Sequence, residues 1–226
     1  MTAFVLGATG FVGREVVRQL AVRATPVVAH VRPKSAAEWT PKLTALGAKV
    51  DASEWDAAAL GKAIDAAGAK QLYILIGTTR HRAKAEAVDG DIYEKIDYGL
   101  TRIACDAAIA SASKPRLVYL SGIGADANAR GAYMKARGRA EDAVRGSGLS
   151  WVIARPAIIT GDRDESRPGE RAGAIVGDGL LAVAGLFSKS VKQKYQSTTP
   201  DVLASALIRI AEAPDHDRVF DGADLR

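Results

Sequence analysis

The stretch that decides the fold is Ala3-Phe-Val-Leu-Gly7-Ala-Thr-Gly10-Phe-Val-Gly13. Its three glycines have the spacing G-x-x-G-x-x-G and stand between an apolar run that predicts a strand and an amphipathic run that predicts a helix. Gly7 allows a sharp turn, Gly10 lets backbone approach a pyrophosphate, and Gly13 lets the helix pack close to the strand. The start of a helix also attracts phosphate. The stretch therefore predicts a dinucleotide site, whose contacts here would be Gly7, Thr9, Gly10, Phe11 and Val12.

The first 155 residues continue this alternation of strand and helix. Short apolar runs bounded by turn residues predict strands over Ala3–Leu6, Val27–Val31, Lys49–Asp51, Gln71–Ile76, Arg116–Ser121 and Trp151–Arg155. Alanine-rich amphipathic runs predict helices over Phe11–Val22, Ala36–Leu46, Asp56–Ala67, Asp91–Ala112 and Tyr133–Gly146. The alternation predicts an α/β fold, a Rossmann-like doubly wound parallel sheet with helices on both faces.

The pattern changes after Arg155. Residues 161–170 are rich in charge, Gly and Pro, which predicts a loop, and an apolar run (174–187) and a basic one (189–194) follow. A helix is predicted from about Pro200 to about Ala213. Because no linker divides the chain, we expect a single domain over residues 1–226. Its dinucleotide-binding core would span about 1–158, and about 159–226 would form a small C-terminal substrate-covering region.

The end of the second predicted strand bears on the choice of cofactor. Proteins that bind NAD place a carboxylate about 20 residues beyond the glycine loop, where it accepts hydrogen bonds from the ribose diol. This chain instead has Arg32-Pro-Lys34 there, and its next acid is Glu38. Arg32 and Lys34 suit a 2′-phosphate, since a guanidinium binds phosphate with two hydrogen bonds. We therefore favour NADP(H) over NAD. The alternative is that both side chains are solvated surface cations.

Two further turns follow predicted strands, at the sheet edge where parallel α/β folds bind their ligands. Asp51 and Ala52 follow the third strand, where the carboxylate and the backbone would contact the adenine. Gly77 follows the fourth strand and permits close approach of backbone to the ribose and diphosphate. The contacts expected from that turn are Ile76, Gly77, Thr78 and Thr79.

Ser121, Tyr133 and Arg137 are the candidate catalytic residues. Ser121 ends the fifth predicted strand, at the edge where the cofactor would lie. Tyr133 and Arg137 stand four residues apart on a predicted helix, so both can point at one ligand. A phenol has a reference pKa of about 10 and needs a nearby cation to transfer a proton readily at neutral pH. Arg137 would supply that charge and bind the nicotinamide ribose. The alternative is a half-buried Tyr with a surface Arg on the next turn.

The chain resembles the atypical, extended-like short-chain dehydrogenase/reductases, and among them the Tat-interacting-protein oxidoreductase branch. The resemblance runs through essentially the whole chain and rests on Gly7–Gly13, Arg32, 77–80, Ser121, 124–126, Tyr133, Arg155-Pro156 and 162–170. It implies NADPH along the strand ends, with Ser121 and Tyr133 near the nicotinamide. We also expect the backbone of Pro156 and Ala157 beside the nicotinamide. The family has Lys where Arg137 stands, which leaves catalytic competence open.

These residues predict an oxidoreductase that reduces a carbonyl or conjugated small molecule by hydride transfer. Tyr133 would donate the proton, Ser121 would orient the acceptor oxygen, and Arg137 would hold the ribose. One alternative is a non-catalytic NADP(H)-sensing regulator that binds a protein partner. Another is a flavin or quinone reductase that does not need Tyr133. The segment 162–171 would fix the tail by ion pairs or recognise substrate, and Leu180–Phe187 would line a cleft or pack in the core.

Composition limits the partners and the location. The 226 residues include one cysteine, Cys105, which excludes an internal disulfide and fits a buried residue in a reducing compartment. The three histidines lie far apart in the sequence, so we expect no metal. The net charge is +5, and the Lys and Arg residues are spread along the chain among acidic residues. This distribution favours a phosphate cofactor over nucleic acid. Without a membrane-length apolar run or a signal segment, we expect a cytoplasmic protein. A homodimer and a protein partner both stay open.

Overall fold

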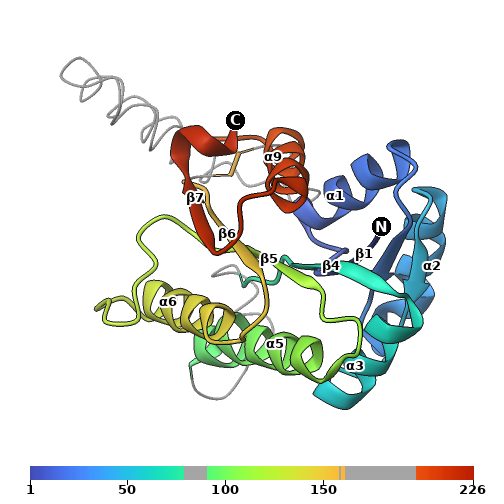
Figure 1. Ribbon diagram of the computed structural model, residues 1–226, viewed down its shortest axis with the longest axis horizontal. Coiled ribbons are helices and arrows are strands. Elements are labelled where there is room, and N and C mark those ends of the chain that lie inside the picture. The colour runs from blue at the N-terminus through green and yellow to red at the C-terminus, as the bar shows by residue number, and fades with distance from the viewer. Residues whose placement is uncertain (79–90, 158, 161–196) are drawn as a thin grey trace.

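The computed structural model describes residues 1–78, 91–157, 159–160 and 197–226. In the described residues, seven strands form one parallel sheet in the order β3-β2-β1-β4-β5-β6-β7 (Figure 1). The strands are β1 (Thr2–Leu6), β2 (Val27–His30), β3 (Lys49–Asp51), β4 (Ala69–Ile74), β5 (Arg116–Leu120), β6 (Trp151–Arg155) and β7 (Arg218–Asp221). The chain order reverses between β1 and β4, which is where such sheets bind ligands. The predicted doubly wound parallel sheet is confirmed.

Helices cover both faces of the sheet (Figure 1). One face carries α1 (Phe11–Val22), α2 (Ala36–Ala45) and α9 (Pro200–Glu212), and the other carries α3 (Ala57–Ala66), α5 (Leu100–Ala110) and α6 (Ala132–Arg145). Successive strand residues point to opposite faces, so Val5 of β1 packs in the first of these two cores and Phe4 in the second. Both faces of the strands are therefore buried, which explains their continuous apolar runs.

Three short helices complete the described structure: η1 (Pro33–Ser35), the π-helix η2 (Tyr93–Gly99) and η3 (Gly222–Leu225). The long helix expected from residue 91 is thus split, because its first part has π-helical geometry before α5 begins at Leu100. A π-helical turn inserts one extra residue and is frequent at functional sites. Here it sits beside the carboxyl end of the sheet.

The C-terminal region contributes to the sheet itself. Strand β7 was not predicted, and it pairs in parallel with β6. Helix α9 buries Leu203 and Leu207 in the same core as Val17 of α1. The described part of this region is therefore built into the domain. The expected loop at 161–170, the apolar run at 174–187 and the basic run at 189–194 lie outside the described residues.

Candidate functional site

The glycine loop has the tight geometry that its spacing predicts. Gly7 has φ +85°, a left-handed conformation that favours glycine, and the Gly10 N–H donates to the carbonyl of Gly7 at 3.0 Å. A Cβ atom at Gly13 would lie 2.1 Å from the same Gly7 oxygen, so only glycine lets α1 approach β1 this closely. Helix α1 begins after Gly10 without a side-chain cap. Its first N–H groups have no partner within the helix and can bind a phosphate.

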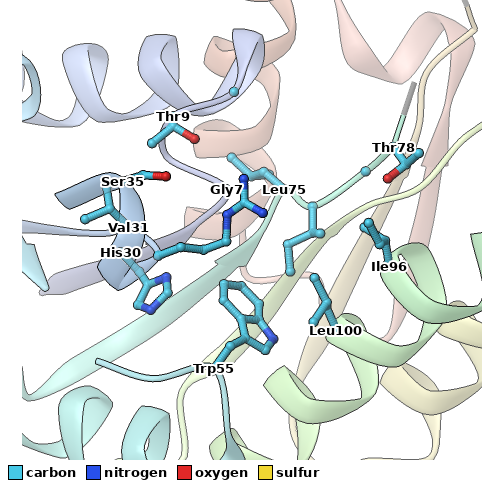
Figure 2. A pocket seen from close by; sticks show the side chains of 14 residues that line it. Gly7, Thr9, His30, Val31, Ser35, Trp55, Leu75, Thr78, Ile96 and Leu100 are labelled. Atoms are coloured by element: carbon cyan, nitrogen blue, oxygen red, sulfur yellow. The ribbon is translucent and has the colours of Figure 1, made fainter. Parts of the chain in front are cut away.

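A pocket of about 120 Å³ opens beside this loop (Figure 2). Figure 2 shows Thr9 and Ser35 on one side of it, His30 and Trp55 on another, and Thr78 with Ile96 at the far end. The lining residues come from the glycine loop, the ends of β2 and β4, η1, the turn after β3, η2 and α5: Gly7, Thr9, Gly10, His30, Val31, Arg32, Ser35, Trp55, Leu75, Ile76, Gly77, Thr78, Ile96 and Leu100. The pocket therefore crosses the switch point of the sheet.

The structure brings seven of the predicted cofactor contacts to this pocket. These are Gly7, Thr9, Gly10, Arg32, Ile76, Gly77 and Thr78. The predicted contacts that do not line it are Phe11, Val12, Lys34, Asp51, Ala52, Tyr133, Arg137, Pro156 and Ala157. Thr79 lies outside the described residues, as does Arg80 of the family resemblance. The side chain of Lys34 is exposed, whereas Arg32, directly before η1, lines the pocket.

Three further residues with polar atoms line the pocket, and no sequence motif predicts that they would: His30, Ser35 and Trp55. The His30 ring lies edge-on to Trp55 at 4.9 Å between centroids, and its Nε2 lies 3.0 Å from the carbonyl oxygen of Ser53. Burial lowers the pKa of His30, which favours the neutral ring at pH 7. Asp51, expected at the adenine, instead accepts hydrogen bonds from the N–H and hydroxyl of Ser53. The wall beside β2 and β3 is thus largely aromatic.

Ser121 lies in a buried polar network. Its hydroxyl donates to the Glu141 carboxylate at 2.6 Å, and Glu141 is fully buried. The same carboxylate accepts from Arg155 at 2.7 and 2.5 Å and from Arg145 at 2.6 Å. The network joins the ends of β5 and β6 to the middle of α6. Because the Ser121 hydroxyl donates to Glu141, its hydrogen bond in this structure connects β5 to α6.

Gly122 is the residue that faces the hydroxyl of Tyr133. A Cβ atom at position 122 would lie 3.7 Å from that oxygen. Ser121 directly precedes Gly122 in the chain, but its hydroxyl donates to Glu141 and not to Tyr133. The ring of Tyr93, from η2, stands edge-on to Tyr133 with centroids 5.4 Å apart.

Arg137 is almost completely buried between the sheet and η2. Its guanidinium donates to the carbonyl of Leu120 at 2.7 Å and to the hydroxyl of Tyr119 at 3.2 Å. It also forms a 3.0 Å ion pair with Asp97, a fully buried carboxylate that the sequence analysis did not single out. The carbon of the guanidinium lies 5.4 Å from the centre of the Tyr133 ring. Tyr133 and Arg137 therefore do share one face of α6, as predicted.

The far end of the pocket lies directly over this ion pair. A Cβ atom at Gly77 would lie 2.3 Å from the terminal nitrogen of Arg137, so a side chain there would displace the guanidinium. Among the described residues, three buried polar atoms near this point have no hydrogen-bond partner: Thr78 Oγ1, Asp97 Oδ2 and Arg137 Nε. Buried polar atoms are nearly always paired, so such a cluster beside a pocket suits a polar ligand. Arg32, the glycine loop and this cluster lie in that order across the sheet edge and could hold the three parts of a dinucleotide.

Comparison with known proteins agrees with this geometry. A family profile described as NAD(P)H-binding matches residues 7–178, and the chain belongs to this NAD(P)H-binding Rossmann family. The protein FMP52, mitochondrial, of Candida albicans is 32% identical over 173 residues, which cover 74% of this chain and 70% of the relative. Its Aspergillus fumigatus counterpart is also 32% identical, over 212 residues covering 90% and 83%. The resemblance to NAD(P)-binding short-chain dehydrogenase/reductases is confirmed at the level of this family.

Solved structures show the same fold at low sequence identity. The NADPH-dependent quinone oxidoreductase QOR2 of Escherichia coli, solved with NADPH, has a TM-score of 0.66 and 20% identity, covering 98% of this chain and 68% of that one. ChuY, an anaerobillin reductase from Escherichia coli O157:H7, has a TM-score of 0.65 and 18% identity, covering 97% and 95%. These similarities show that the chain shares the Rossmann-like fold of these proteins.

The expected cytoplasmic location is wrong by this comparison, because the curated relatives bear the names of mitochondrial proteins. The expectation depended on the lack of a recognisable signal, which says little about the compartment. In the described part of the chain, no helix is long and apolar enough to cross a membrane. The same residues contain no cluster of His, Cys, Asp or Glu that would hold a metal ion.

Proposed function

We propose that this protein is an NADPH-dependent reductase of a carbonyl or conjugated small molecule. The observation that carries the proposal is the position of Arg32, which lines the pocket next to the glycine loop. No Asp or Glu belongs to the described lining, so nothing there offers the ribose diol a carboxylate. A guanidinium at this position matches a 2′-phosphate in charge and in geometry.

The residues around Tyr133 suit proton donation to a substrate oxygen. When bound, NADPH supplies the hydride. Tyr133 holds the proton at its hydroxyl, above Gly122 and beside the positive charge of Arg137. The guanidinium of Arg137, which contacts the ring, would attract the negative charge on the phenol oxygen as the proton leaves, and its ion pair with Asp97 reduces this attraction. Ser121 would act on the substrate oxygen only after releasing Glu141, so Tyr133 is the principal proton donor in this proposal.

A conjugated carbonyl compound, such as a quinone, is the substrate class that we favour. Gly122 lies against the Tyr133 hydroxyl without a side chain, and the Tyr93 ring stands edge-on to the Tyr133 ring. Flat conjugated molecules stack on or against such rings. Two structural neighbours are named as reductases of this kind of acceptor, a quinone oxidoreductase and an anaerobillin reductase.

The choice of cofactor is tested by titrating the protein with NADPH and NADH and following the fluorescence of the reduced nicotinamide. Arg32→Ala should weaken NADPH binding by roughly 10- to 100-fold, the value of a charge-assisted hydrogen-bonded pair, and leave NADH binding nearly unchanged. Lys34→Ala is the matched control, because its side chain is exposed and outside the lining. Equal weakening of both nucleotides in Arg32→Ala would contradict a 2′-phosphate contact.

A non-catalytic NADP(H) sensor is the second candidate. The commitment of the Ser121 hydroxyl to Glu141 favours it, because it removes one expected catalytic group from the Tyr133 side. Tyr133→Phe distinguishes the two: a reductase should lose about 10²- to 10⁴-fold in turnover of a quinone or aldehyde while still binding NADPH. Turnover that is equal in Tyr133→Phe and wild type would remove Tyr133 from the mechanism. NADPH binding without turnover of any screened acceptor would favour the sensor.

A further inference from the structure

The π-helix η2 places a buried acid beside the pocket, and no sequence motif predicts one there. Asp97 lies in this seven-residue segment and its side chain is completely buried. Its Oδ1 pairs with Arg137 at 3.0 Å and accepts from the N–H of Thr78 at 3.3 Å, next to the pocket. Burial raises the pKa of Asp97, and the charge of Arg137 opposes that rise. A carboxylate this deep is tolerated because the cation faces it.

The position of Arg137 is fixed by more than this pair. The Leu120 carbonyl and the Tyr119 hydroxyl hold one terminal nitrogen, and the other lies beneath Gly77. The positive charge therefore cannot move away from the pocket without breaking buried hydrogen bonds. Charges in such a place act over longer distances than at the surface, because water does not screen them.

The cofactor's orientation follows from the sheet. Arg32 stands after β2, on one side of the glycine loop, while Gly77 and Thr78 follow β4 on the other. A dinucleotide with its 2′-phosphate at Arg32 and its pyrophosphate at the loop would have its nicotinamide half on the β4 side. The Asp97–Arg137 pair therefore lies at the nicotinamide end of the pocket.

On the basis of the proposed function, we infer that Asp97 is a positioning residue that balances the charge of Arg137 beside the nicotinamide. It thereby sets how tightly the oxidised cofactor is held relative to the reduced one. NADP⁺ carries a positive charge on its ring that NADPH lacks. With Asp97 present the buried pair is neutral overall, so neither form is repelled. Without Asp97, the uncompensated guanidinium would repel NADP⁺ and leave the neutral ring of NADPH almost unaffected.

The test is a pair of dissociation constants, for NADP⁺ and NADPH, measured by calorimetry on Asp97→Asn. The ratio of the NADP⁺ constant to the NADPH constant should rise roughly tenfold, as one uncompensated charge about 12 Å from the nicotinamide ring produces at an effective dielectric constant of about 20. Asp106→Asn is the matched control, since Asp106 is an exposed carboxylate paired with Arg102 on α5, and its ratio should stay at the wild-type value. A loss of packing alone would weaken both forms by the same factor and leave the ratio unchanged.

The outcomes separate this inference from the proposed function. Binding of both forms by the wild type, with an unchanged ratio in Asp97→Asn, would overturn the role of Asp97 alone. Failure of the wild type to bind either form would overturn the proposed function. If Asp97→Asn does not fold, Asp97→Ser carries the same test, because it also removes the carboxylate beside Arg137 and its ratio should rise in the same direction. An unchanged ratio in Asp97→Ser would equally overturn the inference.

Discussion

At the scale of single residues, Asp65 connects two helices from an exposed position. Its carboxylate, on α3, accepts from the Ser111 hydroxyl at 2.6 Å and from the N–H groups of Ser113 and Ala112 at 2.9 and 3.1 Å. These hydrogen bonds, with Ser111 first, lower the pKa of Asp65 to about 2. The ionised carboxylate therefore stabilises the turn that follows α5 and ties it to α3.

The pH dependence of this contribution follows from the lowered pKa. The stabilisation is fully present above the unfolded value near 3.8 and is lost as the pH falls through about 2. Asp65→Asn should therefore be less stable than wild type at pH 7, and the difference in free energy of unfolding should shrink between pH 4 and 2. Urea titrations at several pH values measure this. A difference that stays constant down to pH 2 would mean that the ionised form is not responsible.

Cys105 illustrates the opposite shift. It is buried in α5, and burial raises the pKa of its thiol to about 12. Since the thiolate is the reactive form, iodoacetamide at pH 8 should leave Cys105 unmodified in the folded protein and modify it fully in urea. Mass spectrometry at timed intervals is the measurement. Rapid modification of the folded protein would show that α5 opens readily.

The sequence predicted site residues that act on their neighbours in the chain, and it missed those whose contacts come from distant parts of the chain. The three loop glycines act on their own turn and on the next helix, so their spacing was sufficient. Ser121 was placed correctly at the end of a strand, but the direction of its hydroxyl depends on Glu141, 20 residues later. Asp97 and Trp55 reach the site only because η2 and the turn after β3 fold over the sheet edge.

At the scale of elements, Gly138 fixes the distance between α6 and the preceding loop. A Cβ atom there would lie 2.1 Å from the backbone nitrogen of Ala127. Gly138→Ala should therefore cost about 1–3 kcal/mol of stability and displace Tyr133 and Arg137, which stand on the same helix. Gly131→Ala is the control, because a Cβ at that position meets nothing within 4 Å. Chemical unfolding and NADPH turnover of the two variants test this; equal stability would show that the loop yields without cost.

Helix boundaries were predictable where a regular apolar period lies between residues that start and end a helix. The bounds of α1 agree with the expected Phe11–Val22, because the glycine loop starts it and its apolar period is regular. The alanine-rich run predicts one helix over residues 91–112, whereas its first part is the π-helix η2 and α5 begins at Leu100. Strand β7 was missed because four residues are too few to show alternation, and its stability comes from pairing with β6.

At the scale of the whole molecule, α9 joins the two halves of the chain. Leu207 is completely buried in the core shared by α1, α9 and one face of the sheet. Leu207→Ala should cost about 2–5 kcal/mol, and because the core is continuous the loss should appear in one cooperative transition. Urea unfolding followed both by tryptophan fluorescence and by circular dichroism tests this. Two separate transitions would mean that the C-terminal region unfolds independently.

The order in which the strands are synthesised also affects how the sheet assembles. Strand β1 emerges first, yet it lies at the centre of the sheet, between β2 and β4. Its second neighbour ends at Ile74, 68 residues after the end of β1 at Leu6, so the ribosome needs roughly 3 to 14 seconds, at 5–20 residues per second, before both edges of β1 can pair. During that interval an apolar strand has an open edge, which can pair with other nascent chains. The yield of folded protein in a cell therefore depends on translation speed and on chaperones, in addition to the stability of the finished domain.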